Sequence, residues 1–184
     1  MKQQLSFFLL SVVIASCAAS RTYSIDYPLT QEVFHSRDND FRGQVPLGWF
    51  SSSLDTLPQA IKVWLLKEDL SASFHIEELW LDRLSSKQVE KEGAKLLAQL
   101  SLAFQQDNVQ NTSMIAEPKE FKIRGREFCG YELNKNGERK RVVVFSFHGK
   151  YYECVAASIK GRWSAQDFNR LFTAQQTLLS SLTF

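Results

Sequence analysis

The chain has 184 residues, of which 12% are aromatic and 23% are charged, and its formal net charge is +2. This composition indicates a folded globular protein and argues against a disordered chain, because the apolar and aromatic side chains can form a core. The nearly balanced charge argues against a nucleic-acid partner, which a strongly basic surface would indicate.

Residues 1–16 are predicted to be a removable secretion signal. Lys2 supplies the positive charge, and residues 5–14 form an apolar run that is interrupted only by Ser6 and Ser11. A run of about ten residues is roughly half of what a bilayer-spanning helix needs, so we interpret it as a signal core and not as an anchor.

The segment Ile14-Ala15-Ser16-Cys17 directly follows this run and resembles the lipobox of bacterial lipoproteins, in which cleavage falls before the cysteine. The resemblance implies that Cys17 becomes the acylated N-terminus and that its lipid holds the protein on a membrane. In lipoproteins of double-membraned bacteria, an Asp after the cysteine commonly retains the protein in the inner membrane. Ala18 stands there instead, which favours the periplasmic face of the outer membrane. The alternative is an ordinary signal peptide, cut after Ala15 or Ala18.

Cleavage leaves 168 residues, which is enough for one domain with a real core. Residues 17–40 are predicted to be the acylated cysteine and a polar tether, with at most one ordered segment around Val33 and Phe34. Residues 41–184 are predicted to form a single α+β domain.

Strand signals begin at residue 41. We expect four strands in this region, over residues 41–45, 48–52, 60–67 and 71–80. The last of them alternates polar and apolar side chains, which is typical of a sheet with one covered and one wet face. A helix then begins at Ser85, where Gln88 completes a capping box, and an apolar stripe runs from Val89 to Phe104.

A second strand group follows a loop over residues 107–118. Its strands are predicted over residues 121–123, 127–133, 139–147 and 150–159. The last helix begins at Ser164, with Asp167 as its capping-box partner and with Trp163 packed against Phe168. The predicted fold is an antiparallel sheet built from two strand groups, with both helices packed on one apolar face.

Pro46-Leu47-Gly48-Trp49 occupies the place of a Pro-x-Gly-Trp segment that often opens members of the PsbP-like superfamily. Together with the order of the elements, this motif makes residues 41–184 similar to that superfamily. The resemblance implies a two-layer α+β sandwich and an accessory or binding role more than a catalytic one. No ligand motif matches, so no metal or partner site is carried over.

The chemistry-bearing residues form no readable metal site, and we expect no cofactor. His35, His75 and His148 lie far from one another in sequence, which leaves no zinc-type spacing. His75 and Glu77 project side by side, and a solvated sheet face explains them better than a proton-transfer or metal role. Residues 38–40 are similar to the start of a calcium loop, but the later ligand positions do not match, so we interpret them as a solvated charge cluster.

Two cysteines remain after lipidation, Cys129 and Cys154. Three successive strands are predicted between and around them, which places the two thiols on non-neighbouring strands. The expected separation of about 9–10 Å is too long for a disulfide without distortion. We therefore expect two small buried hydrophobic side chains with raised pKa values.

One basic cluster is a candidate binding surface, formed by Lys122, Arg124, Arg126, Arg139 and Arg141. The first three share strand parity and are expected to form a basic stripe that could attract anionic headgroups, an acidic partner or an anionic polymer. A solvated outer face, balanced by neighbouring glutamates, explains the same residues more simply.

No catalytic motif occurs, so the sequence favours a lipid-anchored cell-envelope protein with a non-catalytic binding or accessory role. It would support a protein assembly through an envelope protein partner. One alternative is a carrier of a small ligand or metal in the periplasm, using a pocket between helices and sheet or the edge at His75 and Glu77. A less favoured alternative is a hydrolase whose site cannot be recognised in the sequence.

Overall fold

The computed structural model describes residues 24–107 and 112–184, so the predicted signal and lipobox lie outside the described residues. In chain order, the strands and helices of the described part are β1 (Leu29–His35), β2 (Arg42–Pro46), β3 (Trp49–Ser51), β4 (Ile61–Lys67), β5 (Ala72–Leu79), α1 (Arg83–Glu92), α2 (Ala94–Asp107), β6 (Thr112–Ile123), β7 (Arg126–Lys135), β8 (Glu138–Phe147), β9 (Lys150–Ser158) and α3 (Ala165–Ser181). None of the described helices is long and apolar enough to cross a membrane.

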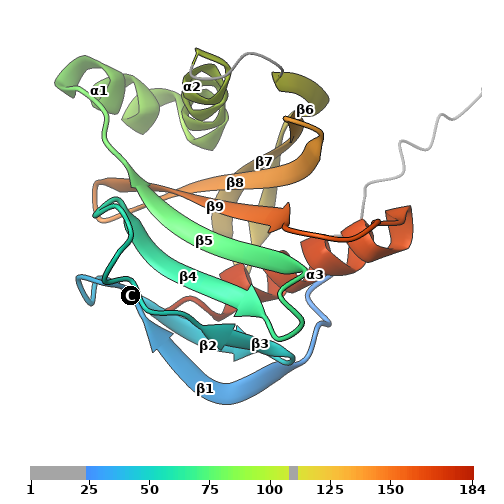
Figure 1. The fold of residues 1–184 in the computed structure, drawn as a ribbon. Helices are drawn as coiled ribbons and strands as arrows, with labels where there is room; N and C mark the ends of the chain where they lie inside the picture. The colour runs from blue at the N-terminus through green and yellow to red at the C-terminus, as the bar shows by residue number, and fades with distance from the viewer. Residues whose placement is uncertain (1–23, 108–111) are drawn as a thin grey trace, which may run out of the picture.

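A seven-stranded antiparallel sheet forms the centre of the molecule, with the strand order β3-β4-β5-β9-β8-β7-β6. A separate hairpin of β1 and β2 lies beside it (Figure 1). Tight hairpin turns join the sequential strands; at the β8–β9 turn, His148 and Gly149 have φ values of 47° and 73°. The α+β class and the antiparallel sheet built from two strand groups are confirmed.

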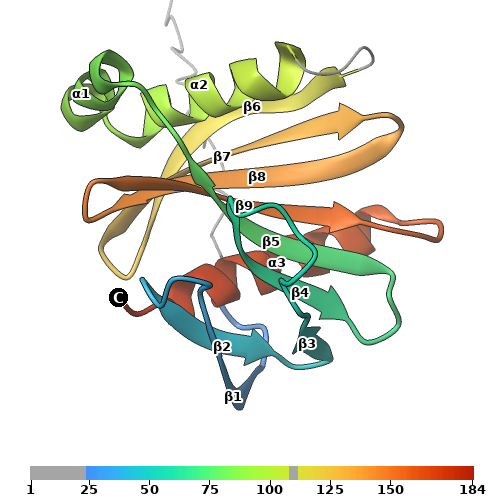
Figure 2. The same cartoon turned by 60° about the vertical axis from the view of Figure 1, so that its left-hand side comes forward.

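The helices cover both faces of the sheet, whereas the sequence predicted both of them on one face. Along β9, Tyr152 and Cys154 belong to the core beneath α3 and the β1–β2 hairpin, and Tyr151 and Val155 belong to the core beneath α1 and α2. Figures 1 and 2 show these two layers on opposite sides of the sheet. The reason is that central strands such as β9 are apolar in both directions, and both of their faces must be covered. The buried residues of the two cores lie between residues 34 and 182.

The predicted central helix is divided into α1 and α2. Gly93, with φ at +81°, interrupts the helical conformation and separates the two segments. The N-cap is also earlier than predicted: the carboxylate of Asp82 accepts hydrogen bonds from the backbone N–H groups of Leu84 and Ser85. The proposed capping box of Ser85 with Gln88 is therefore wrong, because a better acceptor precedes it.

The folded region begins before residue 41, although the sequence analysis assigned residues 17–40 to the acylated cysteine and a tether. Residues of β1 pair with β2, and the Phe34 side chain is buried in the core against α3. Likewise, most of the predicted loop over residues 107–118 belongs to β6, which begins at Thr112 and pairs with β7. These polar strands lie at the periphery, where exposed side chains hide the alternation expected of a strand.

The C-terminal helix and the cysteines agree with the sequence analysis. Ser164 and Asp167 form the capping box of α3, and the Trp163 and Phe168 rings pack 5.3 Å apart. Cys129 on β7 and Cys154 on β9 are separated by β8, and both are buried free thiols. They belong to the two different cores, on opposite faces of the sheet.

Candidate functional site

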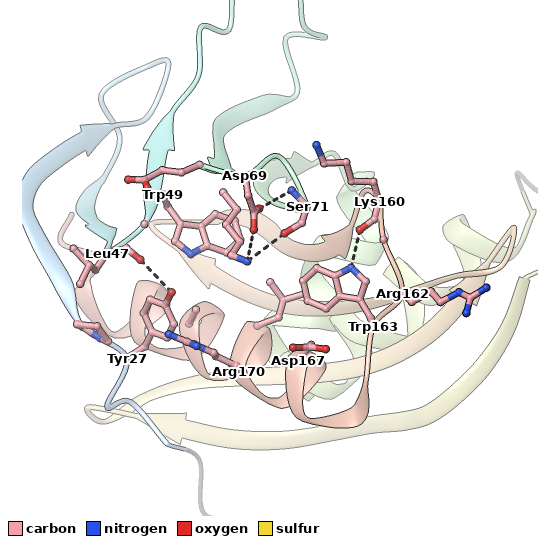
Figure 3. A pocket seen from close by; sticks show the side chains of 17 residues that line it. Tyr27, Leu47, Trp49, Asp69, Ser71, Lys160, Arg162, Trp163, Asp167 and Arg170 are labelled. Atoms are coloured by element: carbon pink, nitrogen blue, oxygen red, sulfur yellow. Dashed lines mark hydrogen bonds and ion pairs between the residues drawn. The ribbon is translucent and has the colours of Figure 1, made fainter.

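A pocket of about 620 Å³ lies beside the first turns of α3. Its walls come from the segment before β1, the β2–β3 turn, the β4–β5 turn and the loop between β9 and α3 (Figure 3). Four segments that are distant in sequence therefore meet at one opening. A pocket of this size falls in the range of about 300–1,000 Å³ that holds small molecules.

The floor of the pocket is the tryptophan of the Pro46-Leu47-Gly48-Trp49 motif. Gly48 adopts a φ of +80° in the turn between β2 and β3, which few other residues adopt without strain. This turn places the Trp49 ring in the core, stacked on Phe74 with ring centroids 3.9 Å apart. The motif on which the family resemblance rested thus also builds the binding surface, although the sequence analysis did not predict that role.

Two further aromatic rings form the walls, and backbone carbonyls hold both of them in place. The Tyr27 hydroxyl donates to the carbonyl of Leu47 at 3.1 Å, and the Trp163 indole N–H donates to the carbonyl of Lys160 at 2.9 Å. Figure 3 shows Tyr27 and Trp163 on opposite sides of the opening. Since the polar ends of these rings are occupied, their apolar faces are what the pocket offers to a ligand.

Two of the three carboxylates that line the pocket, Asp69 and Asp167, are engaged by local partners. Asp69 accepts hydrogen bonds from Ser71 and from the Lys67 ammonium at 2.9 Å, and these contacts hold its pKa well below the usual range. Hydrogen bonds from the backbone and hydroxyl of Ser164 likewise lower the pKa of Asp167, because this carboxylate closes the capping box. Both groups therefore stay ionised at neutral pH and do not serve as proton donors.

The nitrogen donors of Arg170 and Trp49 lack such partners among the described residues. Arg170 forms no ion pair with any carboxylate in the described part of the chain, and its guanidinium lies 5.9 Å from the Tyr27 ring centroid. The Nε1 atom of Trp49, whose side chain is 5% exposed, has no acceptor among the described residues. In Figure 3 the Arg170 side chain lies below the nitrogen edge of Trp49. A buried N–H without an acceptor costs about 1–3 kcal/mol, so an acceptor supplied by a ligand would relieve that penalty.

The structure does not bring the predicted basic stripe together. The chain reverses at Arg124, which has a φ of +49°, so the side chains of Lys122 and Arg126 lie on opposite faces. Lys122 is exposed and pairs with Glu127 at 2.9 Å. Arg126 instead donates to the carbonyl of Leu182 at 2.6 Å. The alternation of faces holds only along a single strand, and the turn at Arg124 separates Lys122 from Arg126. The prediction that they share a face was therefore wrong.

The two remaining arginines of the predicted cluster, Arg139 and Arg141, pack against α3. Arg139 pairs with the buried Glu132 carboxylate and lies 4.8 Å from the Phe168 ring centroid, while Arg141 is buried against Phe172 at 5.4 Å. Both line a second pocket of about 700 Å³ on the α3 face, which is separate from the aromatic pocket. The aliphatic stems and guanidinium planes of both arginines pack against neighbouring side chains. Neither arginine therefore belongs to a solvated outer face.

The two aspartates of the predicted charge cluster at residues 38–40 form ion pairs with lysines. Asp38 lies 2.5 Å from the Lys62 ammonium, and Asp40 lies 2.6 Å from that of Lys150. These pairs join the β1–β2 turn to the central sheet. Among the described residues, no group of three or more His, Cys, Asp and Glu side chains could hold a metal ion.

His75 and Glu77 lie on the sheet face beneath α2, beside the buried Glu153, and this face is less solvated than predicted. Burial lowers the pKa of His75, and Glu77 forms a hydrogen bond with Glu153. The Ser101 hydroxyl bonds to Glu153 and lies 2.7 Å from the Tyr131 hydroxyl. Ser101 and Glu153 of this cluster are buried and line neither of the two pockets, whereas His75 and Glu77 are partly exposed. His35 and His148 are exposed and lie apart from it.

No family model matches the sequence, and no curated protein matches it. Solved structures share the fold. The solution structure of PsbP (CyanoP) from Synechocystis sp. PCC 6803 matches with a TM-score of 0.51 at 11% identity, covering 92% of this chain and 98% of that chain. The crystal structure of the Ran-binding protein Mog1p from Saccharomyces cerevisiae gives a TM-score of 0.53 at 9% identity, covering 84% and 95%. At these identities the likeness establishes a PsbP- and Mog1-like fold and does not establish an activity.

Proposed function

We propose that the chain is the precursor of a lipid-anchored cell-envelope protein whose domain binds a small organic anion in the pocket beside α3. The lipobox that ends at Cys17, directly after an apolar run, supports the anchor. The observation that carries the binding role is the aromatic pocket, at whose opening the Arg170 guanidinium has no ion-pair partner among the described residues. The sequence analysis favoured an accessory role in a protein assembly and gave a small-ligand carrier as an alternative, and the pocket supports this alternative more directly.

The ligand class follows from the groups that the pocket leaves free. The ring faces of Trp163 and Tyr27, with the small exposed part of Trp49, suit a flat or aliphatic body, because they bury apolar area without needing hydrogen bonds. Arg170 suits a carboxylate, sulfonate or phosphate, since a guanidinium forms two parallel hydrogen bonds with such a group. An acid group held there would also lie near the Trp49 N–H, once the exposed Arg170 side chain shifts.

Binding is favoured over catalysis by the state of the acidic groups. Asp69 and Asp167 are held ionised by their own neighbours, and Lys67 is already paired with Asp69. Neither Asp69 nor Asp167 is thus set up to donate and accept a proton in turn at neutral pH. A pocket in which these two carboxylates are engaged and the rings are held in place is suited to holding a ligand unchanged.

The binding role is tested with anilinonaphthalene sulfonate, a fluorescent aromatic anion, titrated into the folded protein. Arg170→Gln should weaken the affinity on the order of tenfold, because the substitution removes a charge-assisted hydrogen bond. Trp163→Leu should weaken it as well, through the loss of ring contact. Arg124→Gln, in an exposed turn outside the pocket, is the matched control and should leave the affinity unchanged. Equal affinities of the Arg170 and Arg124 variants would exclude this pocket as the binding site.

The anchor is tested in cells by incorporation of labelled palmitate and by membrane fractionation. The native chain should carry the label and sediment with the outer membrane, whereas Cys17→Ala should carry no label. A labelled Cys17→Ala form would refute acylation at this residue. An envelope protein partner stays a prediction, to be tested by in-cell crosslinking of the same two forms. One dominant partner that is lost with the anchor would support a role in an assembly.

A further inference from the structure

The outer surface of α1 combines exposed apolar side chains with unpaired cations. Trp80, which precedes the helix, is 74% exposed, and Leu84 in its first turn is 75% exposed. These are the two most exposed large apolar side chains among the described residues. An exposed leucine alone needs no explanation, but a tryptophan and a leucine four residues apart on one short segment do.

Three cations accompany them on the solvent side of the helix. Arg83, Lys87 and Lys91 follow one another at four-residue intervals and therefore lie on successive turns of one face. Val89 is the buried residue of α1, and at about 100° per residue Lys87 and Lys91 lie opposite to it, with Leu84 beside them. We call Trp80, Arg83, Leu84, Lys87 and Lys91 the α1 surface.

The segment that carries this surface also carries three carboxylates, Asp82, Glu90 and Glu92. None of its three cations forms an ion pair with a carboxylate in the described part of the chain. Asp82 is engaged as the N-cap, and Glu90 and Glu92 lie on the flanks of the helix, nearer to its buried side. Like charges at four-residue spacing repel one another, and an external anion beside the α1 surface would relieve this repulsion.

We propose that the α1 surface docks on a membrane that contains anionic phospholipid. Tryptophan is the side chain that settles most readily at the level of the lipid headgroups, and leucine enters the apolar region just below it. Lysine and arginine beside them bind anionic headgroups, each with about 1 kcal/mol near the surface. Charge complementarity thus identifies the occupant: a lipid surface matches both the apolar and the cationic members of the set. This docking does not depend on the lipid at Cys17 or on the aromatic pocket.

The test uses the chain from residue 18 onward, which has neither signal nor acyl group and retains every residue of both cores. Its binding is measured by cosedimentation with vesicles of phosphatidylethanolamine and phosphatidylglycerol, and with vesicles of phosphatidylcholine alone. The chain should bind the anionic vesicles and should be released by high salt. Lys87→Gln with Lys91→Gln should weaken binding by a factor of ten or more, on the order expected for two headgroup contacts.

A matched control removes two lysines elsewhere. Lys119→Gln with Lys122→Gln changes the net charge equally but lies on β6, and it should leave vesicle binding unchanged. Vesicles with brominated acyl chains should quench the tryptophan fluorescence, and Trp80→Phe should abolish that quenching. The proposal fails if the chain ignores anionic vesicles, if both lysine pairs weaken binding alike, or if quenching survives Trp80→Phe. Capture of an acidic protein without vesicle binding would also overturn it.

Discussion

Glu77 on β5 and Glu153 on β9 lie directly opposite each other in the antiparallel sheet, with their carboxyl groups joined by a hydrogen bond. Glu153 is 1% exposed, and α2 covers it through Ser101 and through Gln105, whose amide donates at 3.0 Å. Burial, and then the Glu77 carboxylate, raise the pKa of Glu153 to about 8. The pair therefore holds one proton at neutral pH.

This proton makes the stability of the domain depend on pH. The folded state binds the proton of Glu153 more tightly than the unfolded chain does, so the free energy of unfolding should fall as the pH rises from about 4.5 to about 8. Urea denaturation across this range measures the slope. Glu153→Gln, which keeps the shape of the side chain without an ionisable proton, should flatten it, whereas Glu32→Gln on the exposed part of β1 should not. An unchanged slope in Glu153→Gln would contradict the assignment.

The buried ammonium of Lys62 should contribute more to stability than a surface lysine does. Its side chain is 4% exposed and lies 2.5 Å from Asp38 and 3.0 Å from Glu78. Lys62→Met should lower the free energy of unfolding by about 1–3 kcal/mol, because two carboxylates lose the cation between them. Lys140→Met removes a more exposed pair with Glu138 and should cost less than about 1 kcal/mol. Equal losses in the free energy of unfolding, measured by chemical denaturation, would show that the buried ion pairs of Lys62 contribute no more than the exposed pair of Lys140.

Gly43 on β2 packs against Phe34 of the same hairpin and against Leu182, the C-cap residue of α3. A Cβ atom there would lie 2.6 Å from the Phe34 ring and 3.0 Å from the Leu182 side chain. Gly43→Ala should therefore destabilise the protein by about 1–3 kcal/mol through overpacking. Gly130→Ala is the comparison, since its nearest neighbour, in Phe121, lies at 3.2 Å and the loss should be smaller. Thermal unfolding of the two variants measures both losses of stability. A larger loss in Gly130→Ala than in Gly43→Ala would contradict this packing.

The two buried thiols should be unreactive in the folded state. Burial raises the pKa of Cys129 to about 11 and that of Cys154 to about 12, so almost no thiolate is present at neutral pH. In a Cys17→Ala background, maleimide should label neither residue until the protein is unfolded in guanidinium, when it should label both. Rapid labelling of the folded protein would show that one core opens more readily than its packing indicates.

Local signals in the sequence predicted most helices and strands well. It was harder to predict which helices cover which face of the sheet. The capping box of Ser164 and the hairpin turns are decided by neighbouring residues, so they could be identified from the sequence. The second covered face could not, because apolar residues on both sides of β9 are compatible with several arrangements of the helices. The aromatic pocket escaped detection for a similar reason: Tyr27, Trp49 and Trp163 are far apart along the chain and meet only in the fold.

Strand β5 links the two surfaces proposed for binding. The turn that precedes it contributes Asp69 and Ser71 to the pocket, and Trp80 follows its last residue. Eight extended residues span about 25 Å, so the pocket and the α1 surface lie at opposite ends of one rigid strand. A domain resting on a bilayer through α1 would therefore hold its pocket open to the aqueous compartment, where a ligand can enter and leave while the protein stays on the membrane.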